Sequence, residues 1–218
     1  MRIVVTGFPA FADVTRNPSE KLIATLREEK WSPSEECAVR YTLLPMKPVA
    51  LQTAVQGMFL PEPPDYIFHF GVAVGAEGFR LELSARNVLQ ERPLNNQSVI
   101  ITSQKSTEDV ASAEIIEGGQ RVLHNELPIK RMQTALTDNH LHSYISDDAG
   151  TYFCNMVSYL TAHEIEQKGY ETSSGFIHVP LLEGDEDIAQ RCRVEQPFFF
   201  SEDQLVLGAK SLITACLP

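Results

Sequence analysis

Short apolar runs alternate along the chain with longer segments in which apolar residues recur every three or four positions. Continuous β-branched runs are typical of strands buried on both faces, and the longer spacing is typical of helices with one buried side. The runs predict strands at residues 2–8, 38–45, 65–75 and 174–182, with further candidates at 79–88 and 140–147. The helical spacing covers residues 17–30, 47–59, 127–139, 151–169 and 201–217.

Several helix ends carry local signals. Asn17 is a good N-cap, the proline after it fits the first helical position, and Glu20 can complete a capping box. Ser201 and Gln204 repeat the capping-box pattern before the last helix, and Gly169 is a typical helix stop. Residues 90–119 are polar and poorly periodic, so they predict a long irregular stretch.

The alternation of strands and helices predicts the fold class. Strands that are apolar on both faces need helices on both sides, which gives an α/β fold with a mostly parallel, twisted sheet. The length of 218 residues favours a single three-layer α/β/α domain over residues 1–218. Sites in such sheets form at the carboxyl ends of strands, which directs attention to the ends of the strands at 65–75 and 174–182.

Composition and charge narrow the classes of partner. The net charge of -11 argues against a nucleic-acid partner, which needs a basic surface. No apolar run approaches the roughly 18 residues that span a bilayer, and the first run is too short for a signal-peptide core. The four cysteines show no C-x-x-C spacing, as expected for free thiols in a reducing compartment. We therefore expect a cytoplasmic protein without a membrane partner.

Cys154 is the first candidate for chemistry. It lies among the apolar residues Tyr152, Phe153 and Met156, where a cysteine usually serves only as a small packing residue. Its position in the first turn of the helix at 151–169 points to a second role. Unpaired N–H groups and the helix dipole there stabilise a thiolate, which is the nucleophilic form of cysteine.

His178 and Glu82 are the candidates for partners of that thiol. His178 lies in the apolar strand that follows the Cys154 helix, so the two side chains can meet at one edge of the sheet. A histidine in such a strand is otherwise a hydrogen-bonded core residue. Glu82 lies between two leucines and either alternates outward or points inward, where burial would require a partner such as His178.

Other motifs carry weaker signals. The glycines of residues 71–79 follow neither the dinucleotide nor the Walker spacing, and a strand rather than a helix follows them. His140 and His142 lack a second pair of ligands, and the helix segment at 163–167 lacks the second histidine of a zinc protease. We therefore expect no bound metal and no nucleotide, and we interpret both histidine segments as solvated surface.

Five segments in order resemble the pyroglutamyl peptidase I family of cysteine peptidases, also called pyrrolidone-carboxylate peptidases. The segments are "VTGFPAF", "NPSE", "LPIKR", "DAGTYFCN" and "GFIHVP", and the resemblance runs from Arg2 to about Pro180. It implies a single α/β/α domain that assembles as a homotetramer. It further implies an enzyme that removes an N-terminal 5-oxoproline from peptides without a metal or cofactor.

The resemblance also implies roles for individual residues. It implies a catalytic triad in which Cys154 is the nucleophile, His178 the base and Glu82 the orienting acid, with a thioester intermediate. The expected substrate-binding residues are Phe8, Phe11, Arg92, Tyr152 and Phe153, with the first two rings holding the lactam of N-terminally pyroglutamylated peptides.

The chain departs from the family pattern at a few positions, and two other interpretations stay open. Ala10 replaces a proline, Ala12 and Asp13 replace glycines, and Pro93 replaces a residue that is often isoleucine. One alternative is therefore an impaired homologue that binds pyroglutamyl peptides without efficient turnover. The other is a different hydrolase or nucleosidase on a similar sheet, in which Cys154 would have no role.

Overall fold

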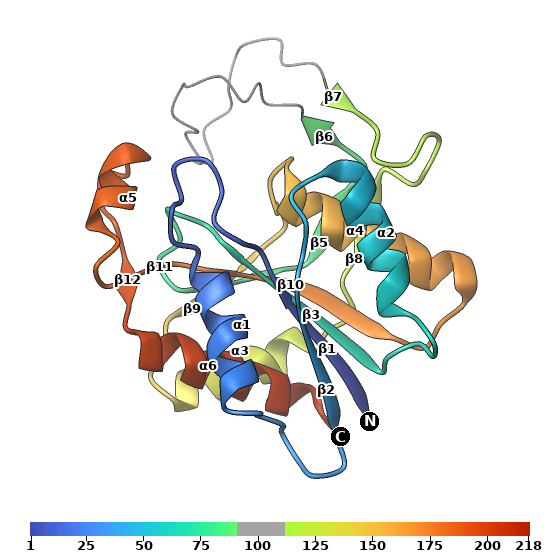
Figure 1. Ribbon diagram of the computed structural model, residues 1–218, viewed down its shortest axis with the longest axis horizontal. Helices are drawn as coiled ribbons and strands as arrows, with labels where there is room; N and C mark the ends of the chain where they lie inside the picture. Colours follow the sequence, from blue (N-terminus) through green and yellow to red (C-terminus); the bar gives the residue numbers. More distant parts are fainter. Residues whose placement is uncertain (91–111) are drawn as a thin grey trace.

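The computed structural model describes residues 1–90 and 112–218, and its centre is a six-stranded sheet (Figure 1). The strands lie in the order β2 (Ala38–Leu43), β1 (Arg2–Gly7), β3 (Tyr66–Val72), β10 (Ser173–Val179), β4 (Phe79–Glu82) and β9 (Ser143–Ser146). The first four strands are parallel, β4 is antiparallel to β10, and β9 is parallel to β4. The prediction of a mostly parallel sheet is confirmed.

Helices cover both faces of this sheet, which gives the predicted three layers (Figure 1). One face packs against α1 (Pro18–Glu28), α3 (Ile129–Asp138) and α6 (Glu202–Cys216). The other packs against α2 (Pro48–Met58) and α4 (Phe153–Lys168). Side chains alternate along each strand, so Ile3 and Val5 face the first layer while Val4 faces the second.

The predicted helix ends agree with the structure, except that Glu20 forms no capping box, because its carboxylate accepts from the N–H of Ala10 instead. The Asn17 side chain accepts from the N–H of Ser19, Ser201 and Gln204 form a reciprocal capping box, and Gly169 ends α4 in the left-handed conformation. No helix in the described part of the chain is long and apolar enough to cross a bilayer.

The structure corrects the predicted elements around the sheet. The strand predicted at 79–88 ends at Glu82, and the chain continues as β5 (Ser84–Arg86), which pairs with β8 (Val122–His124) outside the main sheet. The sequence did not predict the short helix α5 (Glu186–Arg191), because it has only two buried residues. Short pairs also form between β6 (Leu89–Gln90) and β7 (Ser112–Ala113), and between β11 (Leu181–Leu182) and β12 (Phe199–Phe200). Much of the stretch predicted as irregular, at 90–119, lies outside the described residues.

A buried histidine links the sheet to α4. His69 is fully buried in β3, and its two ring nitrogens contact the hydroxyl groups of Thr6 and Thr161 at 2.7 and 3.0 Å. Because no acidic group stabilises its charged form, burial lowers the pKa of His69 to about 3. His69 therefore stays neutral in the folded protein, whereas it takes up a proton in the unfolded chain below about pH 6.5.

This difference predicts a loss of stability in mild acid. Between pH 7 and pH 5 the unfolded chain binds more protons at His69 than the folded chain, so this site should lower the free energy of unfolding by about 2 kcal/mol. Urea unfolding at the two pH values should show a smaller loss in His69→Gln, whose amide can still contact both threonines. His124→Gln, at an exposed position, is the control and should behave like the wild type. Equal losses in wild type and His69→Gln would contradict the prediction.

Candidate active site

The thiol of Cys154 lies at the start of α4, on the face of the sheet that α4 covers. Cys154 is the second residue of that helix and is half-buried, whereas Cys37, Cys192 and Cys216 are buried. A Cβ atom placed on Gly71 of β3 would be only 3.1 Å from the Cys154 sulfur. The sulfur therefore rests directly above the backbone of β3, close to its carboxyl end.

His178 lies on the neighbouring strand at the same level. In the parallel pairing of β10 with β3, His178 is the register partner of Gly71. Adjacent strands are about 4.8 Å apart, so the imidazole and the thiol occupy adjoining positions at the carboxyl edge of the sheet. Cys154 and His178 therefore lie at the same edge of the sheet, as expected from the sequence, and the direct contact of their side chains stays a prediction.

Glu82 points inward and pairs with His178. Its side chain is fully buried, and its Oε1 atom is 2.6 Å from Nδ1 of His178, so the outward alternative for Glu82 is wrong. An ionised carboxylate can only accept a hydrogen bond, so Nδ1 carries the hydrogen. The other ring nitrogen, Nε2, is then unprotonated in the neutral ring and can act as a base.

Arg80 also belongs to this group, and it was missed in the sequence. Its Nε donates to Glu82 Oε1 at 2.6 Å, and a terminal nitrogen lies 3.0 Å from His178 Nδ1. Arg80 and Glu82 are two positions apart in β4, so their side chains share one face. The signal available in the sequence was the spacing of two between Arg80 and Glu82 in "FRLEL". Because alternate residues of a strand share a face, this spacing predicts that an inward Glu82 would have Arg80 as a charged partner.

Burial and neighbouring charges set the protonation of this group. Burial raises the pKa of Glu82, but the hydrogen bond and charge of His178, followed by the charge of Arg80, outweigh it and hold the pKa below its ordinary value. For His178, burial and the Arg80 charge together lower the pKa, against the opposing effect of Glu82. The resting pair is therefore an ionised Glu82 and a neutral His178.

The thiol does not have the lowered pKa expected from its helix position. Burial raises the pKa of Cys154 to about 12, although the Arg80 charge and the backbone N–H of Cys154 itself act in the opposite direction. The lowered pKa expected from the helix position is therefore wrong, since desolvation outweighs the helix terminus here. A thiolate at Cys154 must form by transfer of its proton to a base.

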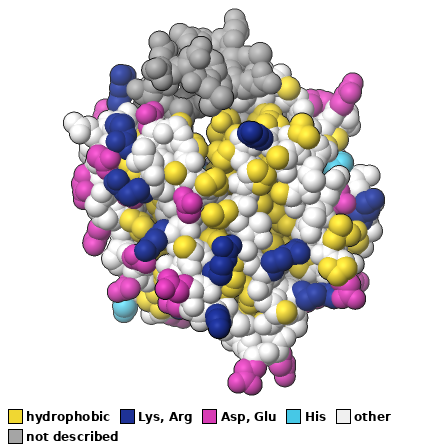
Figure 2. Space-filling model, viewed as in Figure 1, with side chains coloured by type: hydrophobic (Ala, Val, Ile, Leu, Met, Phe, Trp, Pro, Cys, Tyr) yellow, Lys and Arg dark blue, Asp and Glu magenta, His cyan; other side chains and the backbone are white. Residues whose placement is uncertain are grey.

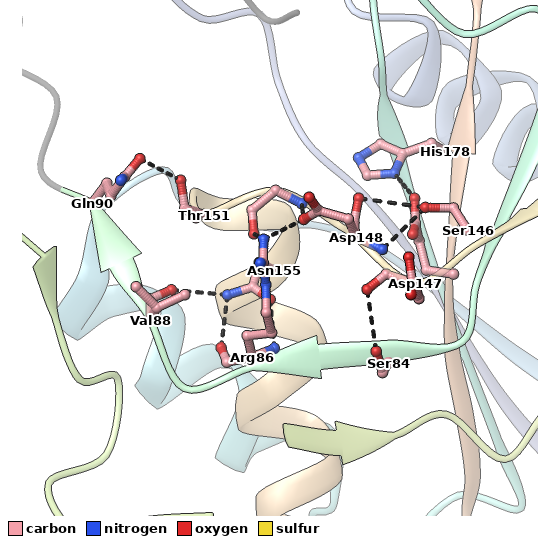
Figure 3. Close-up of polar contacts among 12 residues, drawn as sticks. Ser84, Arg86, Val88, Gln90, Ser146, Asp147, Asp148, Thr151, Asn155 and His178 are labelled. Carbon is pink, nitrogen blue, oxygen red and sulfur yellow. Dashed lines mark hydrogen bonds and ion pairs between the residues drawn. The ribbon is translucent and has the colours of Figure 1, made fainter. Parts of the chain in front are cut away.

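Polar contacts fix the start of α4 and thereby the thiol (Figure 3). Asn155, fully buried next to Cys154, accepts from the N–H of Arg86 and donates to the carbonyls of Arg86 and Val88. Thr151 donates to the side chain of Gln90 on β6, and an Arg86–Asp148 ion pair holds the preceding loop. Asn155 was also missed, and its only signal was a polar residue inside the apolar turn that carries Cys154.

The predicted substrate-binding residues divide into three groups. Phe8 and Phe153 are buried in the apolar cluster against which Tyr152 and Cys154 pack, and the rings of Tyr152 and Phe153 meet edge to face at 4.5 Å. Phe11 is partly exposed and packs instead in a neighbouring cluster that includes residues of α5. Arg92 lies outside the described residues, as does Pro93.

The loop that carries Phe8 and Phe11 keeps an unusual backbone. Ala12 has a φ of 45°, in the left-handed region that favours glycine, and the family resemblance implies a glycine at this position. Arg16 anchors the end of the loop through ion pairs to Asp185 and Asp187, and Arg191 of α5 donates to the Asp13 carbonyl. The loop therefore follows a glycine-like path although alanine occupies the position.

Metal-ligating side chains do not cluster in the described part of the chain. Among residues 1–90 and 112–218, no group of three or more His, Cys, Asp and Glu side chains is arranged to hold a metal ion.

A helix-borne thiol beside a histidine–glutamate pair, at the carboxyl edge of a mainly parallel sheet, is the arrangement of a cysteine-type hydrolase. Comparison with known proteins gives the family. A family model described as pyroglutamyl peptidase matches residues 1–215, so the chain belongs to the pyroglutamyl peptidase family.

Individual relatives agree with this assignment. The pyrrolidone-carboxylate peptidase of Pyrococcus furiosus is 31% identical over 84% of this chain and 82% of its own length. The protein of the same name from Clavibacter michiganensis is 31% identical over 99% of this chain and 92% of its own. A solved structure of pyrrolidone carboxyl peptidase from P. furiosus superposes with a TM-score of 0.81 at 27% identity, covering 99% of this chain and 98% of the other.

The close approach of Cys154 to Gly71 gives a prediction. In Gly71→Ala the new methyl group would lie 2.7 Å from the Phe176 ring and 3.1 Å from the Cys154 sulfur, so both must shift. We expect a loss of about 1–3 kcal/mol in the free energy of unfolding and a several-fold slower alkylation of Cys154 by iodoacetamide. Gly75→Ala is the matched control, because a methyl group there meets nothing within 4 Å. Unchanged stability and alkylation in Gly71→Ala would show that the thiol lies elsewhere.

Proposed function

We propose that this protein is an exopeptidase that hydrolyses the amide bond after an N-terminal pyroglutamyl residue, using Cys154, His178 and Glu82 as its catalytic triad. The observation that carries the proposal is the 2.6 Å contact between Glu82 and His178 Nδ1, next to a thiol held above Gly71. Membership of the pyroglutamyl peptidase family and the names of the relatives support the choice of substrate.

The first half of the reaction forms a thioester. His178 Nε2 takes the proton of the Cys154 thiol as the sulfur attacks the acyl carbon of the pyroglutamyl residue. Because the free thiol is neutral, proton transfer and attack are coupled, and Glu82 stabilises the imidazolium that results. The imidazolium then gives its proton to the leaving amine, the carbon–nitrogen bond breaks, and the shortened peptide leaves.

The second half of the reaction hydrolyses the thioester and releases 5-oxoproline. Water attacks the thioester carbon while His178 accepts one of its protons, and the carbon–sulfur bond then breaks. The thiolate regains a proton from His178, and 5-oxoproline leaves as the free acid. The first N–H groups of α4 suit the oxyanion that forms in both halves, because Tyr152 provides no side-chain cap and the regular helix bonding begins only at Met156.

The proposed choice of substrate follows from the chemistry of the pyroglutamyl residue, which carries no ammonium charge. A pyroglutamyl residue has no free amine, so its flat lactam needs an apolar slot rather than an acidic clamp. We place Phe8, Phe11, Tyr152 and Phe153 around that slot, with Arg92 assisting. Backbone groups then pair with the lactam N–H and carbonyl, since an unpaired buried amide would cost binding energy.

We also propose that residues 1–218 form one domain and that the protein assembles as a homotetramer. The family resemblance supports this assembly, as do exposed apolar side chains such as Val49 and Leu60 and the broad hydrophobic band in Figure 2. Light scattering coupled to size exclusion tests the assembly directly, and a monomer at all concentrations would rule it out.

The nucleophile is tested with pyroglutamyl-7-amido-4-methylcoumarin. Cys154→Ala should abolish release of the coumarin amine while leaving the fold intact, and Cys37→Ala, at a buried position before β2, should retain activity. Iodoacetamide should label Cys154 fastest because it is the most accessible of the four thiols. Full activity in Cys154→Ala would refute the assignment, cleavage insensitive to alkylation would indicate different chemistry, and binding without cleavage would indicate an impaired homologue.

The two other triad members should differ in the size of their effects. His178→Ala should lower kcat by about two to four orders of magnitude, the usual effect of removing a general base. Glu82→Gln should cost less, because Glu82 orients and stabilises the ring without transferring a proton itself. Steady-state kinetics on the same substrate measures both variants, and a larger loss in Glu82→Gln than in His178→Ala would contradict these roles.

A further inference from the structure

Arg80 places a partly buried cation against two members of the proposed triad. In the antiparallel pairing of β4 with β10, Arg80 lies directly opposite His178, and Glu82 lies opposite Phe176. The Arg80 side chain is 20% exposed and the Glu82 side chain is fully buried. A single guanidinium therefore reaches Oε1 of Glu82 at 2.6 Å and Nδ1 of His178 at 3.0 Å.

The two contacts of Arg80 have opposite effects. A carboxylate oxygen has more than one lone pair, so Oε1 of Glu82 accepts from both Arg80 and His178. Nδ1 of His178 has one in-plane position, and the hydrogen directed at Glu82 occupies it. The guanidinium therefore cannot donate to Nδ1, and the second contact brings a cation next to a ring N–H. Arg80 stabilises the charge on Glu82 and destabilises a charge on the ring.

We propose that Arg80 is a positioning residue that keeps Glu82 ionised and His178 neutral, so that the resting site holds a neutral thiol and a neutral base. This proposal rests on the proposed function, in which His178 removes the thiol proton. It assigns to Arg80 a role in setting the pH range of the reaction, because only the neutral ring can act as that base.

None of the other groups named around His178 carries a positive charge that would keep its ring neutral. Glu82 from β4 and Asp148 from the loop before α4 favour a charged ring. Tyr144 and Ser146 from β9 are the register neighbours of Arg80 and Glu82, and both carry neutral hydroxyls. From the α4 layer comes the neutral thiol of Cys154, and from β10 itself the ring of Phe176 at 4.7 Å. Arg80 thus offsets two nearby carboxylates that would otherwise favour imidazolium.

The test compares two substitutions that differ in charge. Arg80→Gln removes the cation, so we expect the titration midpoint of His178 and the acid limb of kcat/KM to rise by about one unit. Arg80→Lys keeps a cation and should retain most of the wild-type pH profile, even if kcat falls through loss of the two-point contact. Arg2→Gln, whose side chain bridges Glu62 at the other end of the sheet, is the control for net charge and should change neither quantity.

The midpoint is measured by NMR on the ring Cε1–H of His178, assigned by its absence in His178→Gln. This titration needs no substrate, so it tests the role of Arg80 even if coumarin release fails and the proposed function with it. A folded Arg80→Gln with an unchanged midpoint would overturn the proposal. A shift in Arg80→Lys as large as that in Arg80→Gln would also overturn it, because contact geometry rather than charge would then be responsible.

A second variant covers the case in which Arg80→Gln does not fold. In Glu82→Gln the ring of His178 faces Arg80 without the compensating carboxylate, so adding Arg80→Gln to Glu82→Gln should raise the midpoint of His178. A folded double variant with the same midpoint as Glu82→Gln would show that the guanidinium does not act on the ring and would overturn the proposal. Melting temperatures of all variants, measured in parallel, confirm that each titration reports a folded protein.

Discussion

The hydrogen bond between Glu82 and His178 is the interaction on which the site depends. A fully buried carboxylate is tolerated only with partners for its charge, and here the histidine and Arg80 supply them across one strand pair. The reversal of β4 against β10 creates this pairing, because the antiparallel register places Arg80 opposite His178. The departure of the sheet from a fully parallel order therefore occurs at the point where the chemistry is expected.

Glycine provides the space in which α4 brings the thiol to that pair. The missing side chain at Gly71 lets the Cys154 sulfur and the ring of Phe176 approach the backbone of β3. Gly7 serves α1 in the same way, because a Cβ atom there would lie 2.6 Å from the Ser19 carbonyl. The Ser19 hydroxyl in turn accepts from the N–H of Phe8, so close packing of α1 also fixes the start of the loop that carries the two candidate lactam residues.

The sequence predicted the layers, and it placed Cys154 and His178 at one sheet edge, because both follow from periodicity and from the rule that sites lie at strand ends; the direction of Glu82 stayed open until its burial was known. It did not predict Arg80, since the partner of a buried acid is identified only once its face and register are known. Asn155 and α5 were missed for a similar reason, because their contacts join segments distant in sequence. The predicted lowering of the Cys154 pKa failed because a helix terminus acts locally, whereas desolvation depends on packing that no sequence pattern displays.

The neutral resting site changes how the helix terminus contributes to catalysis. If the thiol were already ionised, the first N–H groups of α4 would be engaged with a sulfur anion before substrate arrived. With a neutral thiol above Gly71 and a neutral His178, charge develops only as the proton moves and the sulfur attacks. The donors at the start of α4 then act mainly on the transition state and the oxyanion, where stabilisation accelerates the reaction, and little on the ground state. Arg80 and the burial of Cys154 and His178 therefore act together with the helix terminus. They keep the thiol and the ring neutral at rest, so that negative charge forms only in the step in which the N–H groups of α4 can stabilise it.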